Sequence, residues 1–354
     1  MAVIFRVRGA TVRGERRGRL CPLLVGLALL VVMRAGAEQG ASVLVFPRVA
    51  AAEDRDTLVQ LANLTESTAH VRCFYAGNGP PVVAFRLELG RLQPTMWSAR
   101  QGRAVDSSDL RCGAGNLSCV GAGNDPGEIP ALIDGFEGAL WCVQTDAEGR
   151  PSGGDALSGQ ATIEERDSGD IARHGAIGLA AAGPNDGDEA LCLGGEPRPD
   201  CPSGAEYEGC PDTWLLPHLA DGTIEPATRD GTVGVEMSLA LCSQDLAASG
   251  SEARLTFALT NELEESFSAA TTVPGWSSFG LAAAGSVFRR EVAGTDQVFT
   301  RIRSAGGAAS GLIVAAEVVR DNGDGTARSA LQPLRQGSQS GGDVLRLPPA
   351  SESR

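Results

Sequence analysis

Short apolar runs that alternate with polar residues recur along most of the chain, and Gly, Pro, Asn or Asp residues bound them. This two-residue period is typical of β-strands, and few windows show the 3.6-residue period of an amphipathic helix. Between Ala253 and Thr260, for example, Leu255, Phe257 and Leu259 alternate with less apolar neighbours. We therefore expect an all-β fold whose strands bury one face.

The expected strands fall into two sets. The first comprises residues 42–46, 57–62, 70–75, 82–89, 139–145, 160–164 and 176–181, and the second comprises 234–241, 253–260, 287–292, 298–303 and 312–319. A stretch rich in Pro and Cys separates the sets and is typical of a pinned connector. We predict two tandem immunoglobulin-like β-sandwich domains, 38–198 and 213–335, joined by a connector at 199–212 and followed by a flexible tail at 336–354.

A faint internal similarity accompanies this division. Val59–Asn63 and Phe257–Asn261 both alternate in polarity and end in Asn. A duplication explains the similarity, and so does convergence, because Asn at the end of a strand hydrogen-bonds the turn that follows. Both interpretations predict similar β-rich domains.

The first 37 residues have the parts of a secretory signal peptide. Six arginines precede the apolar run Leu23–Met33, and Ala35-Gly36-Ala37 provides a small-residue cleavage site. The run is shorter than the roughly 20 residues that a bilayer requires. We expect cleavage after Ala37, no membrane span in the mature chain, and export to the periplasm or the medium.

Composition excludes several classes of function. Every basic residue is arginine, so Schiff-base lysines, a Walker-type phosphate loop and Ser-Lys dyads are absent. The net charge of −14 argues against nucleic acid or an anionic membrane as the partner, because these require a basic surface. An unidentified protein or a glycan is the expected partner.

Eight cysteines remain after the expected cleavage, and an even number in an exported chain predicts disulfides. Cys112 and Cys119 flank a glycine-rich segment and are expected to close a local loop. Cys73 and Cys142 lie in strand-like runs that suit a bridge within or between sheets. The other four candidates, whose pairing stays open, are Cys192, Cys201, Cys210 and Cys242. Zinc-binding spacings are absent, and no cofactor is expected.

Five segments carry a resemblance to known sequences. They are 42–48 (SVLVFPR), 55–63 (RDTLVQLAN), 71–75 (VRCFY), 135–142 (GFEGALWC) and 261–268 (NELEESFS). Together they resemble a group of uncharacterised exported bacterial proteins, and the resemblance spans most of the mature chain. It implies no activity, catalytic residue or cofactor. The related chains place a cysteine near Trp276, where this sequence has none, so the resemblance leaves the partner of Cys242 open.

A few residues could carry chemistry. His218 and Asp221 are the most suggestive pair for a hydrolase, although a lone His beside a turn is more often structural. Residues 321–326 (DNGDGT) look like a calcium loop, but their register puts Arg320 at the first ligand position, so a turn is favoured. Residues 186–189 (DGDE) are interpreted in the same way. Core packing is expected for Trp141, whereas the three other tryptophans are candidates for surface contacts.

These observations favour a non-enzymatic exported protein that serves as an envelope or extracellular binding or structural module. No catalytic, cofactor-binding or metal-ligating residue is assigned. One alternative is a secreted hydrolase that uses carboxylates or His218-centred chemistry, which a cleft of acids without a neutralising arginine would favour. Another alternative is a calcium-stabilised adhesion module.

Overall fold

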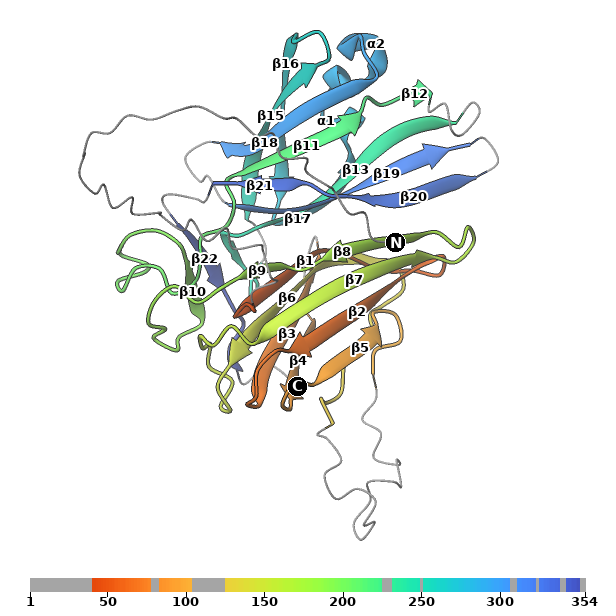
Figure 1. Ribbon diagram of the computed structural model, residues 1–354. Coiled ribbons are helices and arrows are strands. Elements are labelled where there is room, and N and C mark those ends of the chain that lie inside the picture. Colours follow the sequence, from red (N-terminus) through yellow and green to blue (C-terminus); the bar gives the residue numbers. More distant parts are fainter. Residues whose placement is uncertain are drawn as a thin grey trace, which may run out of the picture. The chain divides into compact units, whose positions relative to one another are not determined.

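Strands dominate the computed structural model, which describes residues 40–77, 83–103, 125–224, 231–248, 251–305, 311–322, 325–337 and 342–350. Within these ranges the fold is all-β, as predicted, with several antiparallel sheets, none of them closed (Figure 1). Glu38–Arg354 forms one compact unit. The predicted signal peptide at 1–37 lies outside the described residues. No helix in the described ranges is long and apolar enough to cross a membrane.

The first sheet contains nine strands in the order β4-β3-β6-β1-β2-β7-β8, with β5 paired to β2 and β9 paired to β1. Its strands are β1 (Val43–Ala51), β2 (Arg55–Asn63), β3 (Ala69–Gly77), β4 (Val83–Leu89), β5 (Pro94–Ser98), β6 (Phe136–Thr145), β7 (Leu157–Glu165), β8 (Ile171–Gly175) and β9 (Ile177–Leu179). Every residue of β1 is buried. Leu44 and Phe46 contribute to one apolar cluster, and Val43 and Val45 contribute to another, so both faces of this strand are covered.

The second sheet is small and contains the C-terminal strand. It consists of β10 (Ala190–Leu193), β22 (Asp343–Arg346) and β14 (Gln244–Asp245), with β22 in the middle. Leu345 of β22 is fully buried and Leu347 nearly so. Residues 343–346, which the sequence assigns to a flexible tail, therefore form a buried strand between two segments distant in sequence.

The third and fourth sheets share an apolar cluster. The third sheet has the order β16-β15-β18-β11-β21 and consists of β16 (Ser266–Pro274), β15 (Glu252–Asn261), β18 (Gln297–Ala305), β11 (Thr213–Leu219) and β21 (Leu334–Gln336). The fourth has the order β12-β13-β19-β20, with β17 also paired to β13, and consists of β12 (Thr223–Ile224), β13 (Thr232–Leu241), β19 (Leu312–Asp321), β20 (Thr326–Leu331) and β17 (Trp276–Gly280). Leu255 and Phe257 of β15 pack in one cluster with Met237 of β13 and Val314 of β19.

Three short helical segments follow β17: α1 (Leu281–Ala284), the 3-10 helix η2 (Ser286–Phe288) and α2 (Arg290–Ala293). The strand expected at 287–292 is therefore wrong. Phe288 and Ala293 are buried, and Gly294 ends α2 in the left-handed conformation with φ of 75°. Glycine adopts that conformation without a steric penalty. The other expected strands all overlap observed ones.

β2 and β15 end in the same way. Each ends in a buried Asn, Asn63 or Asn261, whose Oδ1 accepts a hydrogen bond at 2.9 Å from the backbone two residues later, at Thr65 N or Leu263 N. Local hydrogen bonding of this kind accounts for the similarity between the two segments without requiring a duplication.

Three cysteine pairs lie at disulfide distance. Cys73 of β3 is directly opposite Cys142 of β6 in the strand register, and their Sγ atoms are 2.06 Å apart. The other two pairs are Cys192–Cys201 and Cys210–Cys242. The last two pairs attach the segment expected as a connector to β10 and to the residue after β13. Cys112 and Cys119 lie outside the described residues.

Candidate functional site

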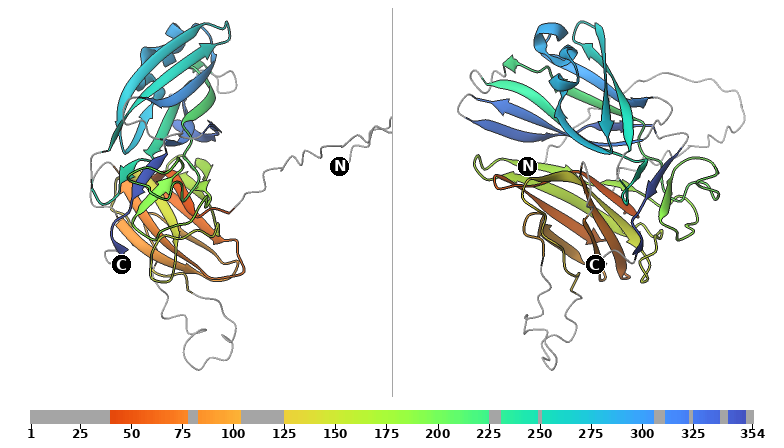
Figure 2. Two further views of the ribbon diagram at one scale, coloured as in Figure 1. Left: turned by 90° about the vertical axis from the view of Figure 1, so that its left-hand side faces the viewer. Right: turned by 180° about the vertical axis from the view of Figure 1, so that it is seen from behind.

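The outward face of the third sheet carries three exposed arginines. β15 buries Ala253, Leu255, Phe257 and Leu259, so its alternate residues, Arg254 among them, point outward. Figure 2 shows the strands of this sheet side by side. β18 alternates in the same way and exposes Arg301 and Arg303. The arginines occupy the outward positions of these strands, between buried residues, and so make the outward face of the sheet basic.

The strand register places these arginines close together. Residues directly opposite in antiparallel strands share a face of the sheet. Arg303 is opposite Thr256 and Thr213, and Arg301 is opposite Ala258 and Leu215. Arg254 is opposite Ala305 and is therefore diagonal to Arg303. We call Arg254, Arg301, Arg303 and the outward residues opposite them the arginine face.

No carboxylate among the described residues pairs with the arginine face, although acidic residues outnumber basic ones in the chain. Nε of Arg303 donates a hydrogen bond to Thr213 Oγ1 at 2.9 Å, which orients that side chain. Glu252, opposite Pro274, is acidic and lies at the corner of the sheet. The three guanidinium groups are therefore available for an anion from outside.

The same face has an apolar margin. Phe299 of β18 is 39% exposed, and it is opposite the exposed Pro217 of β11. Leu215 is half-buried beside Leu334, which is 54% exposed. A sheet face that exposes both cations and apolar groups has the composition of a contact surface.

A buried group of charged side chains lies at a different place, where the first and fourth sheets meet. Arg48 of β1 is only 3% exposed. Its Nη1 donates to Glu236 Oε1 at 2.8 Å and to Ser238 Oγ at 2.9 Å, and its Nε lies 3.4 Å from Glu317 Oε1. The two glutamates and the serine belong to β13 and β19, so one arginine side chain links strands from two sheets.

Two further basic side chains reach the same carboxylates. His174 Nε2 of β8 lies 3.2 Å from Glu317 Oε1, and Arg328 Nη1 of β20 lies 3.4 Å from Glu317 Oε2. Arg328 also pairs with Glu236. We call Arg48, His174, Glu236, Glu317 and Arg328 the ion cluster. Buried charges persist when they are paired in this way.

The electrostatics of the ion cluster keep both carboxylates ionised. Burial raises the pKa of Glu236, but the nearby charges of Arg48 and Arg328, with their hydrogen bonds, outweigh burial and lower this pKa to about 2. Burial also raises the pKa of Glu317, and the His174 hydrogen bond and the Arg48 charge bring it below its ordinary value. Carboxylates neutralised by arginine are poor general acids, so the cluster fits a structural role better than a catalytic one.

Two grooves lie near these elements. One, of about 340 Å³, borders the ion cluster and is lined by Asp221, Glu236, Asp321 and Arg328 among others. The other, of about 520 Å³, crosses β5, β2 and β7, and its lining contains no charged residue. Met96, which is 59% exposed, is its most exposed large apolar side chain.

His218 is a buried structural residue in β11. Its Nδ1 lies 2.8 Å from the carbonyl of Leu219, to which it must donate, and its Nε2 lies 2.8 Å from Thr300 Oγ1. Burial lowers its pKa to about 4, although the Leu219 hydrogen bond opposes the change. No hydrogen bond or ion pair among the described residues joins His218 to Asp221, whose pKa burial raises. The structure does not bring this pair together as a catalytic unit.

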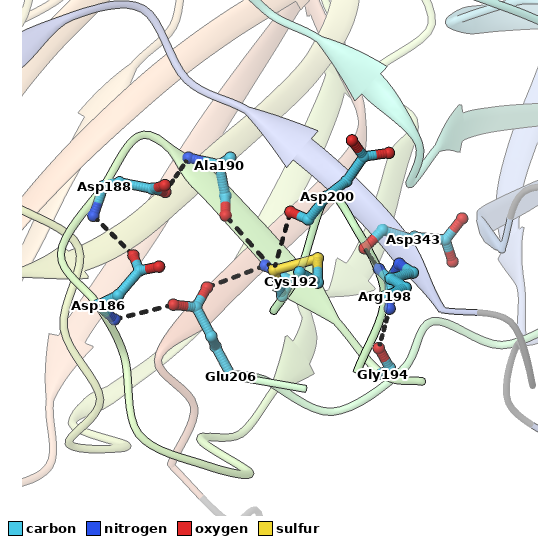
Figure 3. The surroundings of a disulfide bond; sticks show 10 residues. Asp186, Asp188, Ala190, Cys192, Gly194, Arg198, Asp200, Glu206 and Asp343 are labelled. Carbon is cyan, nitrogen blue, oxygen red and sulfur yellow. Dashed lines mark hydrogen bonds between the residues drawn. A yellow bond between two sulfur atoms is a disulfide. The ribbon is translucent and has the colours of Figure 1, made fainter. Parts of the chain in front are cut away.

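The carboxylates of Asp186 and Asp188 in the acidic loop at 186–189 bind backbone N–H groups of the same segment and do not converge on a calcium site (Figure 3). Asp186 accepts from the backbone N–H of Asp188 at 3.0 Å, and Asp188 accepts from that of Ala190 at 2.7 Å. The buried Glu206 accepts from the backbone of Cys192 and of Asp186. Burial raises the pKa of Glu206, and these hydrogen bonds act in the opposite direction. The oxygens are thus occupied by backbone donors.

The other calcium candidate joins two strands. Asp321 of β19 pairs with Thr326 of β20, so the segment connects a hairpin, as the sequence favours, and residues 323 and 324 lie outside the described ranges. Among the described residues, the metal-capable atoms that gather within 4.8 Å belong to Cys210, Cys242 and Asp343. The two sulfurs are bonded to each other and so offer no thiolate.

All four tryptophans are buried, so Trp97, Trp214 and Trp276, the candidates for surface contacts, are core residues. The indole Nε1 of Trp97 donates to Tyr75 Oη at 2.6 Å, that of Trp214 to Leu312 O at 2.8 Å, and that of Trp276 to Pro47 O at 2.9 Å. Trp141 is fully buried, as predicted.

Sequence reasoning singled out neither the arginine face nor the ion cluster. The alternation of Arg with apolar residues in 298–303 was a usable signal for the face. The cluster joins strands more than 100 residues apart, and a single sequence gives no signal for such pairings. No protein-family model matches the chain, and no curated protein is significantly similar to it.

Proposed function

We propose that the chain is an exported, non-enzymatic binding module of the cell envelope or the extracellular space, and that it binds its partner through the arginine face. One observation carries the proposal. Three exposed guanidinium groups lie on one open sheet surface of an acidic chain, with no carboxylate partner among the described residues. Unpaired like charges repel one another, so an anionic partner would stabilise this arrangement.

Several features support export and a two-domain organisation. Disulfides are typical of oxidising compartments, and three pairs lie at disulfide distance. One apolar cluster is formed by strands of the first sheet, and another by strands of the third and fourth. We infer two immunoglobulin-like sandwiches at 38–198 and 213–335, behind a signal peptide cleaved after Ala37. A third apolar cluster, with Trp141, Ile313 and Leu345, joins the two halves.

The hydrolase and calcium alternatives gain no supporting observation within the described residues. The ring nitrogens of His218 both have structural partners, and the buried carboxylates of the ion cluster are paired with arginine. In the acidic loop at 186–189, carboxylate oxygens of Asp186 and Asp188 accept hydrogen bonds from backbone N–H groups.

Binding of the purified protein to a panel of anionic, neutral and cationic polymers and proteins tests the proposal. The face variant R254Q/R301Q/R303Q is compared with R173Q/R289Q/R346Q, which removes the same charge at exposed sites elsewhere. We expect binding to anionic members that the face variant loses and the control variant retains. Equal binding by the two variants, or binding that depends on Met96 in the uncharged groove, would contradict the proposal.

A further inference from the structure

We propose that the partner of the arginine face is a polysaccharide that carries carboxylates. This inference rests on the proposed function and names the chemistry of its ligand. The spacing of the cations is the first argument. Arg301 and Arg303 are two residues apart on one strand, which separates their Cα atoms by about 7 Å. Arg254 is diagonal to Arg303 on the next strand, at about 7–8 Å. The Cα atoms of the three arginines thus follow one another at about 7–8 Å on one face of the sheet.

Guanidinium groups select for planar anions. Each can donate two parallel N–H bonds to one carboxylate, and a row of them fits a polymer with repeated carboxylates better than one small anion. The density of charge also matters. The chain has a net charge of −14, so it repels a polymer with the charge density of duplex DNA, about one charge per 1.7 Å. A polysaccharide with at most one carboxylate per sugar meets less repulsion.

The side chains around the arginines favour a sugar over a protein. Interfaces between proteins are enriched in Tyr, Trp, Phe, Met and Arg and depleted of Ser and Ala. The outward residues of β15 and β16 are instead small or hydroxylated: Thr256, Ala258, Thr260, Ser268, Ala270 and Thr272. Hydroxyl groups both donate and accept hydrogen bonds and so match the hydroxyl groups of a sugar. Because these side chains are short, they leave room for a polysaccharide chain to lie across the sheet.

Phe299 completes the surface. The residue is 39% exposed and lies on the same strand and face as Arg301 and Arg303, where its ring offers an apolar surface to the carbon-bound hydrogens of a sugar ring. The four tryptophans are buried, and the indole N–H groups of Trp97, Trp214 and Trp276 are bonded inside the protein. Phe299 is therefore the aromatic group through which this face would contact a sugar.

Titration of the full protein with polygalacturonate tests the inference, and methyl-esterified polygalacturonate provides the same sugar backbone with its carboxylates masked. We expect binding to the acid form, a loss of affinity of about tenfold or more on esterification and in R254Q/R301Q/R303Q, and near-unchanged affinity in R173Q/R289Q/R346Q. Raised salt is expected to weaken the binding. Near-ultraviolet circular dichroism checks that both variants keep the wild-type fold.

Equal affinity for the acid and ester forms would overturn the inference, and so would tighter binding of duplex DNA or of an acidic protein. The experiment distinguishes failure of the polysaccharide inference from failure of the proposed binding function. If polygalacturonate does not bind while another anionic panel member binds in a manner that needs the three arginines, the polysaccharide inference fails and the binding module stands. If the face variant loses no binding to any member, both fail.

Discussion

Replacing Arg48 tests whether the ion cluster stabilises the packing of the first sheet against the fourth. In Arg48→Met the apolar stem is kept, but Glu317, which is 1% exposed, loses one of its cations, and Glu236 loses its 2.8 Å hydrogen bond. Removing one partner of a buried ion pair costs about 3–5 kcal/mol. Because Arg328 and His174 still reach Glu317, we expect the lower end, about 3 kcal/mol.

Urea unfolding, followed by tryptophan fluorescence with the disulfides intact, measures this loss. Trp276 is a suitable reporter because its indole donates to the carbonyl of Pro47, beside Arg48. The matched control is Arg173→Met, an exposed arginine without an ion pair among the described residues, and it should change stability by no more than about 0.5 kcal/mol. A double-mutant cycle with Glu317→Gln should give a coupling of about 0.5–3 kcal/mol.

The pH dependence supplies an independent check. The pKa of Glu236 falls from an ordinary 4.5 to about 2 in the folded protein, so the unfolded state binds more protons between these values. Its contribution is therefore complete above about pH 4.5 and is lost as the pH falls toward 2. The difference between wild type and Arg48→Met should shrink over that window. An Arg48→Met variant as stable as Arg173→Met, or a cycle with no coupling, would refute the structural role of the cluster.

Three other predictions concern the framework. The Cys73–Cys142 bridge joins residues 69 positions apart. Its removal in a double alanine variant should lower the free energy of unfolding by about 4 kcal/mol, and an unchanged denaturation midpoint would contradict a stabilising role for the bridge. Leu345→Ala should cost about 2–5 kcal/mol because that strand residue is fully buried, whereas Leu334→Ala, at an exposed position, should cost far less; equal losses would mean that β22 is not packed as described. His218, with a pKa of about 4, should remain neutral down to about pH 5 by NMR titration, and protonation near pH 6.5 would show that it is exposed.

Local sequence patterns predicted the strands well because the alternation of apolar and polar residues within a strand reflects which of its faces is buried. β15 is the clearest case, since its apolar residues alternate over the whole strand. The prediction for 287–292 was wrong because Val287 and Val292 suit a strand, whereas the buried Phe288 lies in a 3-10 helix and Gly294 ends α2 in the left-handed conformation. β22 was missed because four residues between glycine- and proline-rich stretches resemble a linker, and only its two distant partner strands make it part of a sheet.

The two sites differ in how far the sequence could reveal them. The arginine face follows from the alternation of exposed arginines with buried residues in β15 and β18. It was therefore predictable from the sequence, given that both segments are strands. The ion cluster was not predictable, because Arg48 finds its partners at Glu236 and Glu317 through tertiary packing. His218 shows the converse, since a residue that looks reactive in sequence has its ring nitrogens occupied inside the sheet.

Hydroxyl-radical footprinting of the protein with and without polygalacturonate tests most directly that the arginine face is the binding surface. The method reports the exposure of side chains, and three exposed apolar groups serve as probes: Phe299 (39%) and Leu334 (54%) on the face, and Met96 (59%) in the uncharged groove. The account predicts that the polymer slows oxidation of Phe299 and Leu334 and leaves Met96 unchanged. Protection of Met96 with Phe299 unprotected would contradict it.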